Sequence, residues 1–279
     1  MSLRKRSLLQ RLMILLVVAG TTLLILFPLY WMLTTSFKPE AEIFQIPATL
    51  FPESLALENY EFAFSETQIP LYFLNSVIYV LGTLVVVLVC GSLAAYGMSR
   101  FKFRFKVGFL LVLLLTQVMP MTTLIVPLFI SFGELGLLNN RLALVAVYAA
   151  IQLPLAIWLL LSYFNSVPRE IDEAARIDGC TNLQVLIQII LPLAKPGLMA
   201  VGLSVAIWVW QELMLATTFT TMDSMRPLMA GISASIGRAG VRWGQMNAAG
   251  MISIVPIIIA YIFLQRNLVA GLTGGAVKE

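Results

Sequence analysis

Long apolar blocks alternate with short polar stretches along the chain, and the length of the blocks sets the first prediction. A helix that crosses the hydrocarbon core of a bilayer needs about 20 consecutive apolar residues. Blocks of this length occupy residues 12–34, 70–98, 107–131, 141–163, 196–218 and 249–270. They are continuously apolar, whereas the strands of a membrane barrel are short and alternate. The pattern therefore predicts an all-α membrane protein with six transmembrane helices.

The composition agrees with a bilayer as the main solvent. Hydrophobic residues make up 59% of the chain and charged residues 11%, whereas charged residues make up about one quarter of an ordinary soluble domain. The mean hydropathy is +0.92. The first block is longer than the core of a signal peptide and runs into Phe37-Lys38-Pro39 without a small-residue cleavage site, so we expect it to remain as a span.

Basic residues are distributed unequally among the loops. Lys and Arg gather near both ends of the chain, in residues 100–106 and in residues 164–195, while acidic residues dominate the first loop of the other side. Because basic loops stay in the cytosol, we expect both termini to be cytosolic. The predicted domains are a cytosolic N-terminus (1–11), a transmembrane permease domain (12–270) with the cytosolic loop 164–195, and a cytosolic tail (271–279).

Several functions are disfavoured by missing chemistry. No lysine has the Gly-Lys-Ser/Thr context of a phosphate-binding loop, and the chain contains no histidine. The net charge of +4 comes from basic residues beside apolar blocks, where they orient spans rather than bind nucleic acid. Cys90 and Cys180 lie in segments of different character and suggest neither a disulfide nor a metal site. We expect no enzyme, and neither a cofactor nor a metal bound by this chain.

The cytosolic loop 164–195 has the punctuation of two short helices. Pro168 suits a first helical position, and Gly179 can take the left-handed conformation that ends a helix. Thr181 and Gln184 form a capping-box pattern that opens a second helix, which we expect to end near Pro192. The first helix begins with acidic residues that complement its positive dipole end: Glu170, Asp172 and Glu173.

Small residues recur on the first of these helices. Ile171, Ala174, Ala175 and Asp178 fall at helical spacing, so the alanines leave a shallow face that another surface can approach closely. One interpretation is a docking surface for a cytosolic partner. The other is an amphipathic hairpin that lies against the protein's own helix ends.

The spacing within this loop resembles a family signature. The loop is similar to the EAA signature of ABC importer permeases. The matching pattern is Glu173-Ala174-Ala175, three residues, Gly179, nine residues, Ile189, one residue and Leu191-Pro192. The resemblance implies the type I permease fold and a coupling helix that seats in a cleft of an ATPase subunit. It implies as partners a second permease, two ATPase subunits that carry ATP and Mg, and an extracytoplasmic solute-binding protein. The coupling residues it implies are Glu173, Ala174, Ala175, Asp178, Gly179, Leu191 and Pro192.

Four further stretches resemble the shorter permease of the carbohydrate-uptake branch, the MalG-like type. They are residues 28–39, Asn75-Ser76, 94–100 and 271–278. The resemblance implies a bacterial or archaeal plasma membrane and a carbohydrate substrate such as a di- or oligosaccharide, with a polyol phosphate such as glycerol-3-phosphate as the alternative. It also implies a second cytosolic contact through the tail residues Gly275, Val277 and Lys278. The other interpretation of the tail is an unattached terminus.

The fifth block contains an acidic residue. In Trp210-Gln211-Glu212, Gln211 stands where the family commonly has Asn. Charged residues in spans usually face the protein interior or a polar pathway, so Glu212 is either part of a translocation path or gate, or a structural hydrogen-bond partner. Trp210 could stack on a sugar ring or pack in the core. An ion-coupled secondary transporter, the rival class, needs more buried ionisable residues than the blocks contain.

Overall fold

The computed structural model describes residues 8–239 and 242–274, and within these ranges the chain is helical and contains no strand. Within the described residues, four helices are long and apolar enough to cross a membrane. They are α1 (Leu8–Ser36), α4 (Ile69–Arg100), α7 (Arg141–Ser166) and α14 (Trp243–Gly274). Two bent helix pairs raise the number of candidate spans in the described residues to as many as six. The all-α membrane fold is thus confirmed.

The span predicted over 107–131 is sharply bent. The segment forms α5 (Lys106–Val118) and α6 (Met121–Glu134), which meet at 92°. Met119 and Pro120 both have extended backbones at the break. The proline ring disfavours helical geometry in the residue before it and removes one backbone donor, which explains why the helix stops there.

The fifth block is also divided. α11 (Lys195–Gln211) ends before Glu212, and α12 (Met214–Phe219) follows it, so a single helix over 196–218 is wrong. No proline lies at this break, and sequence periodicity alone gave no sign of it. Before α11, Ala194 separates the helical segment 182–193 from α11 at an angle of 81°.

The chain divides into two compact units. Unit 1 comprises residues up to Gln68 together with 234–254, and unit 2 comprises 69–233 together with the residues from Val255 onward. Unit 1 contains α1 and the short elements α2 (Glu40–Ile43), α3 (Glu58–Glu61) and the π-helix η1 (Phe62–Glu66). α13 (Leu228–Ala239) and α14 contribute residues to both units.

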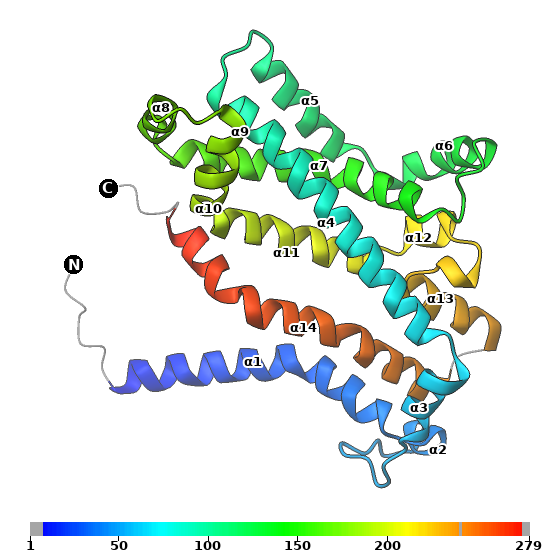
Figure 1. The fold of residues 1–279 in the computed structure, drawn as a ribbon. Helices are drawn as coiled ribbons and strands as arrows, with labels where there is room; N and C mark the ends of the chain where they lie inside the picture. The colour runs from blue at the N-terminus through cyan, green and yellow to red at the C-terminus, as the bar shows by residue number, and fades with distance from the viewer. Residues whose placement is uncertain (1–7, 240–241, 275–279) are drawn as a thin grey trace. The chain divides into compact units, whose positions relative to one another are not determined.

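The core of unit 2 is built around α4 and α7, with α11 packed against both and α5 against α7 (Figure 1). Its fully buried side chains include Tyr79, Tyr148, Leu160 and Phe164. α11 approaches α7 closely, because a Cβ atom on Gly197 would lie 2.4 Å from the ring of Tyr163. Close contact of this kind requires glycine.

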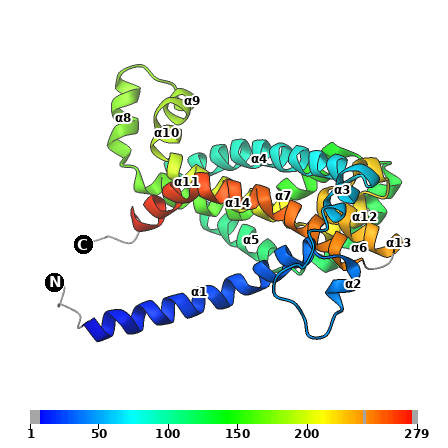
Figure 2. The ribbon, with the colours of Figure 1, turned by 90° about the horizontal axis from the view of Figure 1, so that it is seen from below.

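At one end of unit 2 the chain forms a hairpin between α7 and α11, which we call the α8–α10 hairpin. Figure 2 shows it projecting from the end where α4 and α7 terminate. The chain enters it at Val167 and Pro168, directly after α7. Its elements are α8 (Arg169–Ile177), α9 (Asn182–Val185), the π-helix η2 (Leu186–Ile190) and α10 (Leu191–Leu193).

Candidate functional site

The ends of α8 are fixed by local sequence. Pro168, predicted at the first helical position, occupies the N-cap one residue earlier with an extended backbone, and acidic residues fill the first turn. At the other end Gly179 has φ +90°, Cys180 N–H donates to the Ala175 carbonyl at 3.0 Å, and Gly179 N–H donates to the Arg176 carbonyl at 3.1 Å. This pair of bonds is a Schellman motif, in which the left-handed residue is usually glycine.

The second arm of the α8–α10 hairpin begins with the predicted capping box. Thr181 N–H donates to Oε1 of Gln184 at 2.8 Å, and Gln184 N–H donates to Oγ1 of Thr181 at 3.3 Å. The arm continues through η2 and α10 and ends at Leu193, beside Pro192. The capping box satisfies two backbone donors that the start of a helix otherwise leaves free.

α8 has two distinct faces. The exposed face has the spacing i, i+3, i+4, i+7 of a helical stripe. It consists of Glu170, Glu173, Ala174 and Ile177, and the Ile177 side chain is 86% exposed. Asp172 and Ala175 are buried on the other face. The predicted common face of Ala174 and Ala175 is therefore wrong, because consecutive residues on a helix point about 100° apart.

The remaining residues of the signature lie around this face. Asp178, Gly179 and Pro192 are exposed, and Leu191 is half-buried. The structure thus brings one charged, partly apolar surface to the tip of the α8–α10 hairpin, with Ala175 beneath it.

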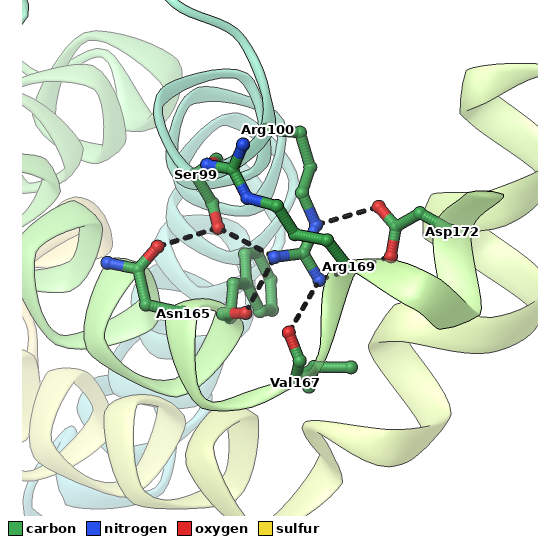
Figure 3. Close-up of polar contacts among 7 residues, drawn as sticks. Ser99, Arg100, Asn165, Val167, Arg169 and Asp172 are labelled. Atoms are coloured by element: carbon green, nitrogen blue, oxygen red, sulfur yellow. Dashed lines mark hydrogen bonds and ion pairs between the residues drawn. The ribbon is translucent and has the colours of Figure 1, made fainter.

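The buried face of α8 is held by Arg100, the last residue of α4. Its Nε donates to Oδ2 of Asp172 at 2.7 Å and its Nη2 donates to Oδ1 at 3.1 Å, which makes a bidentate ion pair (Figure 3). Both side chains are 3% exposed. The fork geometry of arginine matches the two carboxylate oxygens and fixes the direction as well as the distance.

The other donors of Arg100 also reach acceptors. Nη1 donates to the Phe164 carbonyl at 3.1 Å and to Oγ of Ser99 at 3.2 Å, and Nη2 donates to the Val167 carbonyl at 3.2 Å. All five N–H groups of the guanidinium therefore have partners. A buried charge is tolerated only when it is paired and hydrogen-bonded in this way.

Two further hydrogen bonds join the same three segments. Ser99 Oγ donates to Oδ1 of Asn165 at 2.8 Å, and Arg169 Nη2 donates to the Ser99 carbonyl at 2.8 Å (Figure 3). The end of α4, the end of α7 and the start of α8 are thus tied together. A displacement of α8 must be transmitted to α4, or it must break a buried ion pair.

The pairing of Arg100 with Asp172 is not predicted from the sequence, where Arg100 is expected to orient a span and Asp172 to complement the helix dipole. The two residues are 72 positions apart, and nothing local identifies them as partners. The only available signal is that Asp172 and Ala175 share a face opposite the exposed stripe of α8.

Glu212 lies at the break between α11 and α12 and is 8% exposed. Its carboxylate accepts from Tyr148 Oη at 2.9 Å, from Leu215 N–H at 2.8 Å and from Ala216 N–H at 2.9 Å. Both oxygens are therefore occupied by donors of the chain itself, and Glu212 caps the first turn of α12. This geometry favours the structural interpretation over a place in a translocation path.

The neighbours of Glu212 differ from it and from each other. Trp210 is buried and packs edge-on against Phe73, with ring centroids 5.4 Å apart, which favours the packing interpretation. Gln211 is exposed. Of these three residues, Gln211 alone offers an exposed polar side chain. The predicted tail contacts Gly275, Val277 and Lys278 lie outside the described residues.

Comparisons with known proteins agree with this architecture. Residues 87–274 match the family described as "Binding-protein-dependent transport system inner membrane component". The sulfoquinovosyl glycerol transport system permease protein SmoH of Agrobacterium fabrum is 35% identical over 263 residues, which cover 94% of this chain and 92% of the relative. The trehalose/maltose transport system permease protein MalG of Thermococcus litoralis is 34% identical, covering 98% and 99%.

A solved structure supports the fold. A chain from the crystal structure of a bacterial ABC transporter involved in the import of the acidic polysaccharide alginate superposes with a TM-score of 0.83 at 24% identity, covering 96% of this chain and 100% of that chain. At this identity the likeness establishes the fold, which is that of a type I importer permease. With the fold, the family match and relatives aligned over nearly their full length, the chain belongs to the family of inner membrane components of binding-protein-dependent transport systems.

Proposed function

We propose that this chain forms half of the translocation pathway of an ATP-driven importer for a di- or oligosaccharide, and that the exposed face of α8 docks on an ATPase subunit. The observation that carries the proposal is the pairing of an exposed surface with a buried anchor on one helix. Glu173, Ala174 and Ile177 are available to a partner, while Asp172 is tied to Arg100 at the end of α4.

The chemistry of the exposed face suits a protein partner. The small side chain of Ala174, beside Glu170 and Glu173, allows close approach. The large apolar side chain of Ile177 would be buried on docking. The ion pair beneath would then carry the movement of the ATPase subunits to α4 and, through the carbonyls of Phe164 and Val167, to the end of α7. In this proposal ATP and Mg are bound by the partner, and this chain supplies no catalytic group.

The names of the relatives support a carbohydrate substrate. They include transport proteins for sulfoquinovosyl glycerol, diacetylchitobiose and trehalose/maltose. The expected partners are a second permease, two ATPase subunits and an extracytoplasmic binding protein that delivers the solute. The basic loops support an orientation with both termini and the α8–α10 hairpin in the cytosol.

The test is reconstitution of the chain with its second permease, ATPase and binding protein. We expect ATP-dependent uptake of an oligosaccharide and ATP hydrolysis that is stimulated by the loaded binding protein. Glu173→Arg should abolish both, whereas Glu134→Arg, an exposed acidic residue at the end of α6, serves as the matched control. Solute uptake by the purified chain alone under an ion gradient would contradict the proposal and favour a secondary transporter.

A further inference from the structure

Unit 1 contains a loop that exposes large apolar side chains. Residues 43–51, which we call the apolar loop, contain no charged side chain. Within it Ile46 is 95% exposed, Phe51 71%, Phe44 64% and Leu50 56%. Two charged residues that precede it, Glu42 and Lys38, are buried, at 7% and 2% exposure, whereas Glu40 and Glu53 beside it are exposed.

The apolar loop is held in this arrangement by specific hydrogen bonds. Lys38 Nζ donates to the Thr49 carbonyl, and its ammonium lies 5.1 Å from the centroid of the Trp31 ring. Glu42 Oε1 accepts from Thr49 Oγ1 at 2.7 Å and from Glu53 N–H at 3.1 Å. Because polar groups of the loop are bonded inward, the outward direction of its apolar side chains is built into the fold.

The apolar loop lies beside the end of a predicted membrane span. Tyr30 of α1 donates its hydroxyl to the Leu50 carbonyl at 2.8 Å, and its ring meets Phe51 edge-on with centroids 6.0 Å apart. The preceding turns of α1 carry exposed apolar side chains, among them Leu24 at 76% and Phe27 at 53%. The exposed apolar surface of α1 therefore continues onto the loop.

Aromatic residues gather where α1 meets the apolar loop. Phe27 and Trp31 pack against each other on α1 with centroids 6.0 Å apart, and Tyr30 and Phe51 pair nearby. Trp and Tyr are enriched where hydrocarbon meets headgroups, because their rings combine an apolar body with a polar atom. An irregular backbone cannot enter the hydrocarbon core, so this depth is the one that a non-helical apolar loop can occupy.

We propose that residues 43–51 insert into the bilayer interface at the C-terminal end of α1 and bind lipid. The occupant is the headgroup and upper acyl region, which accepts an uncharged patch of aromatic and aliphatic side chains. Continuity with the exposed apolar surface of α1, a candidate membrane span, favours lipid over a protein partner, and so does the absence of charged side chains from residues 43–51 themselves. This proposal does not depend on the identity of the ATPase partner or of the solute.

The test uses the full chain, assembled with its partner subunits in phospholipid nanodiscs, with Cys90 and Cys180 replaced by alanine. A nitroxide label is attached at Ile46→Cys, and its relaxation is measured with oxygen, which concentrates in lipid, and with a water-soluble nickel chelate. Leu24→Cys on α1 provides the lipid control, and Glu58→Cys, an exposed residue of α3, provides the aqueous control.

We expect the ratio of oxygen to nickel accessibility at residue 46 to be several-fold higher than at residue 58 and lower than at residue 24. Quenching of a fluorophore at the same site by brominated lipid should agree. A ratio at residue 46 equal to that at residue 58 would overturn the proposal. So would a label that is shielded from both reagents only when a partner subunit or the binding protein is present, because the occupant would then be protein. Phe44→Cys provides a second labelling site if Ile46→Cys does not accumulate.

Discussion

The α8–α10 hairpin of unit 2 and the apolar loop of unit 1 are each held by buried charged side chains and each expose a distinct surface. In the first, Arg100 and Asp172 are buried beneath α8, whose exposed stripe carries Glu170 and Glu173. In the second, Lys38 and Glu42 are buried and both bind Thr49.

The two regions differ in what they leave outside. The exposed stripe of α8 is acidic with one large apolar residue, which suits water and a protein partner. The apolar loop exposes only uncharged side chains, which suits lipid. In both regions the buried charged residues fix the position of the surface, whereas the exposed residues determine which kind of partner it suits.

The largest effect should come from Arg100→Ala. The change leaves the Asp172 carboxylate and two backbone carbonyls buried without their donor, and removing one partner of a buried pair costs about 3–5 kcal/mol. We expect a lower unfolding temperature in detergent and loss of ATP-driven uptake. Arg104→Ala, at an exposed position in the following loop, is the control.

The double variant Arg100→Met/Asp172→Leu separates stability from coupling. It removes both charges, so most of the lost stability should return, because an apolar replacement of a buried pair is often neutral. Uptake should stay impaired, since the directional link between α4 and α8 is gone. Equal unfolding temperatures for Arg100→Ala and the parent chain would show that the ion pair does not hold α8.

A tryptophan scan of two neighbouring alanines tests which face of α8 is outward. Ala175→Trp places a large ring at a buried position, and overpacking should destabilise the chain by about 1–3 kcal/mol. Ala174→Trp lies on the exposed face and should leave the unfolding temperature unchanged while it blocks ATPase binding, measured by co-purification. If the two variants behaved alike in both assays, the assignment of faces would be refuted.

Aspartate at one exposed isoleucine of each region sharpens the comparison of partners. Ile46→Asp places a charge at the proposed lipid interface, where a carboxylate costs less than about 1 kcal/mol, and should lower the brominated-lipid quenching of a label at residue 44. Ile177→Asp should leave that signal unchanged and reduce the affinity for the ATPase. Unchanged lipid quenching in Ile46→Asp would contradict lipid insertion of the apolar loop.

The smallest effect concerns acid pH in unit 1. Burial raises the pKa of Glu42, but hydrogen bonds from Thr49 and Glu53 and the charge of Lys38 together lower it by more. The pKa of Glu42 therefore lies below the ordinary value of 4.5. A pKa that is lower in the folded state contributes stability above pH 4.5, which is lost as the pH falls through the folded pKa.

Glu42→Gln tests this contribution. We expect the variant to lose less stability between neutral pH and the acid range than the parent chain does, as measured by thermal unfolding. Glu53→Gln, at an exposed position, is the matched control. An identical pH profile for Glu42→Gln and the parent would mean that the carboxylate does not hold the apolar loop.

Features that depend on neighbouring residues are predictable from the sequence. The length of the apolar blocks gave the membrane-spanning helices, and the signature of the cytosolic loop led to the family. The beginning and end of α8 followed from Pro168 and Gly179, and the start of the next helix from Thr181 and Gln184. These features are predictable because a cap, a left-handed glycine and a hydrophobic block act within a few residues.

Which residues face each other depends on contacts between distant segments. Tertiary structure broke the fifth block at Glu212, whose acceptors are satisfied by Tyr148 and by the start of α12. It paired Arg100 with Asp172 and thereby turned Ala175 inward and Ala174 outward. Ion pairing and burial depend on side chains brought together from distant segments. Neither periodicity nor composition shows which distant segments will be in contact.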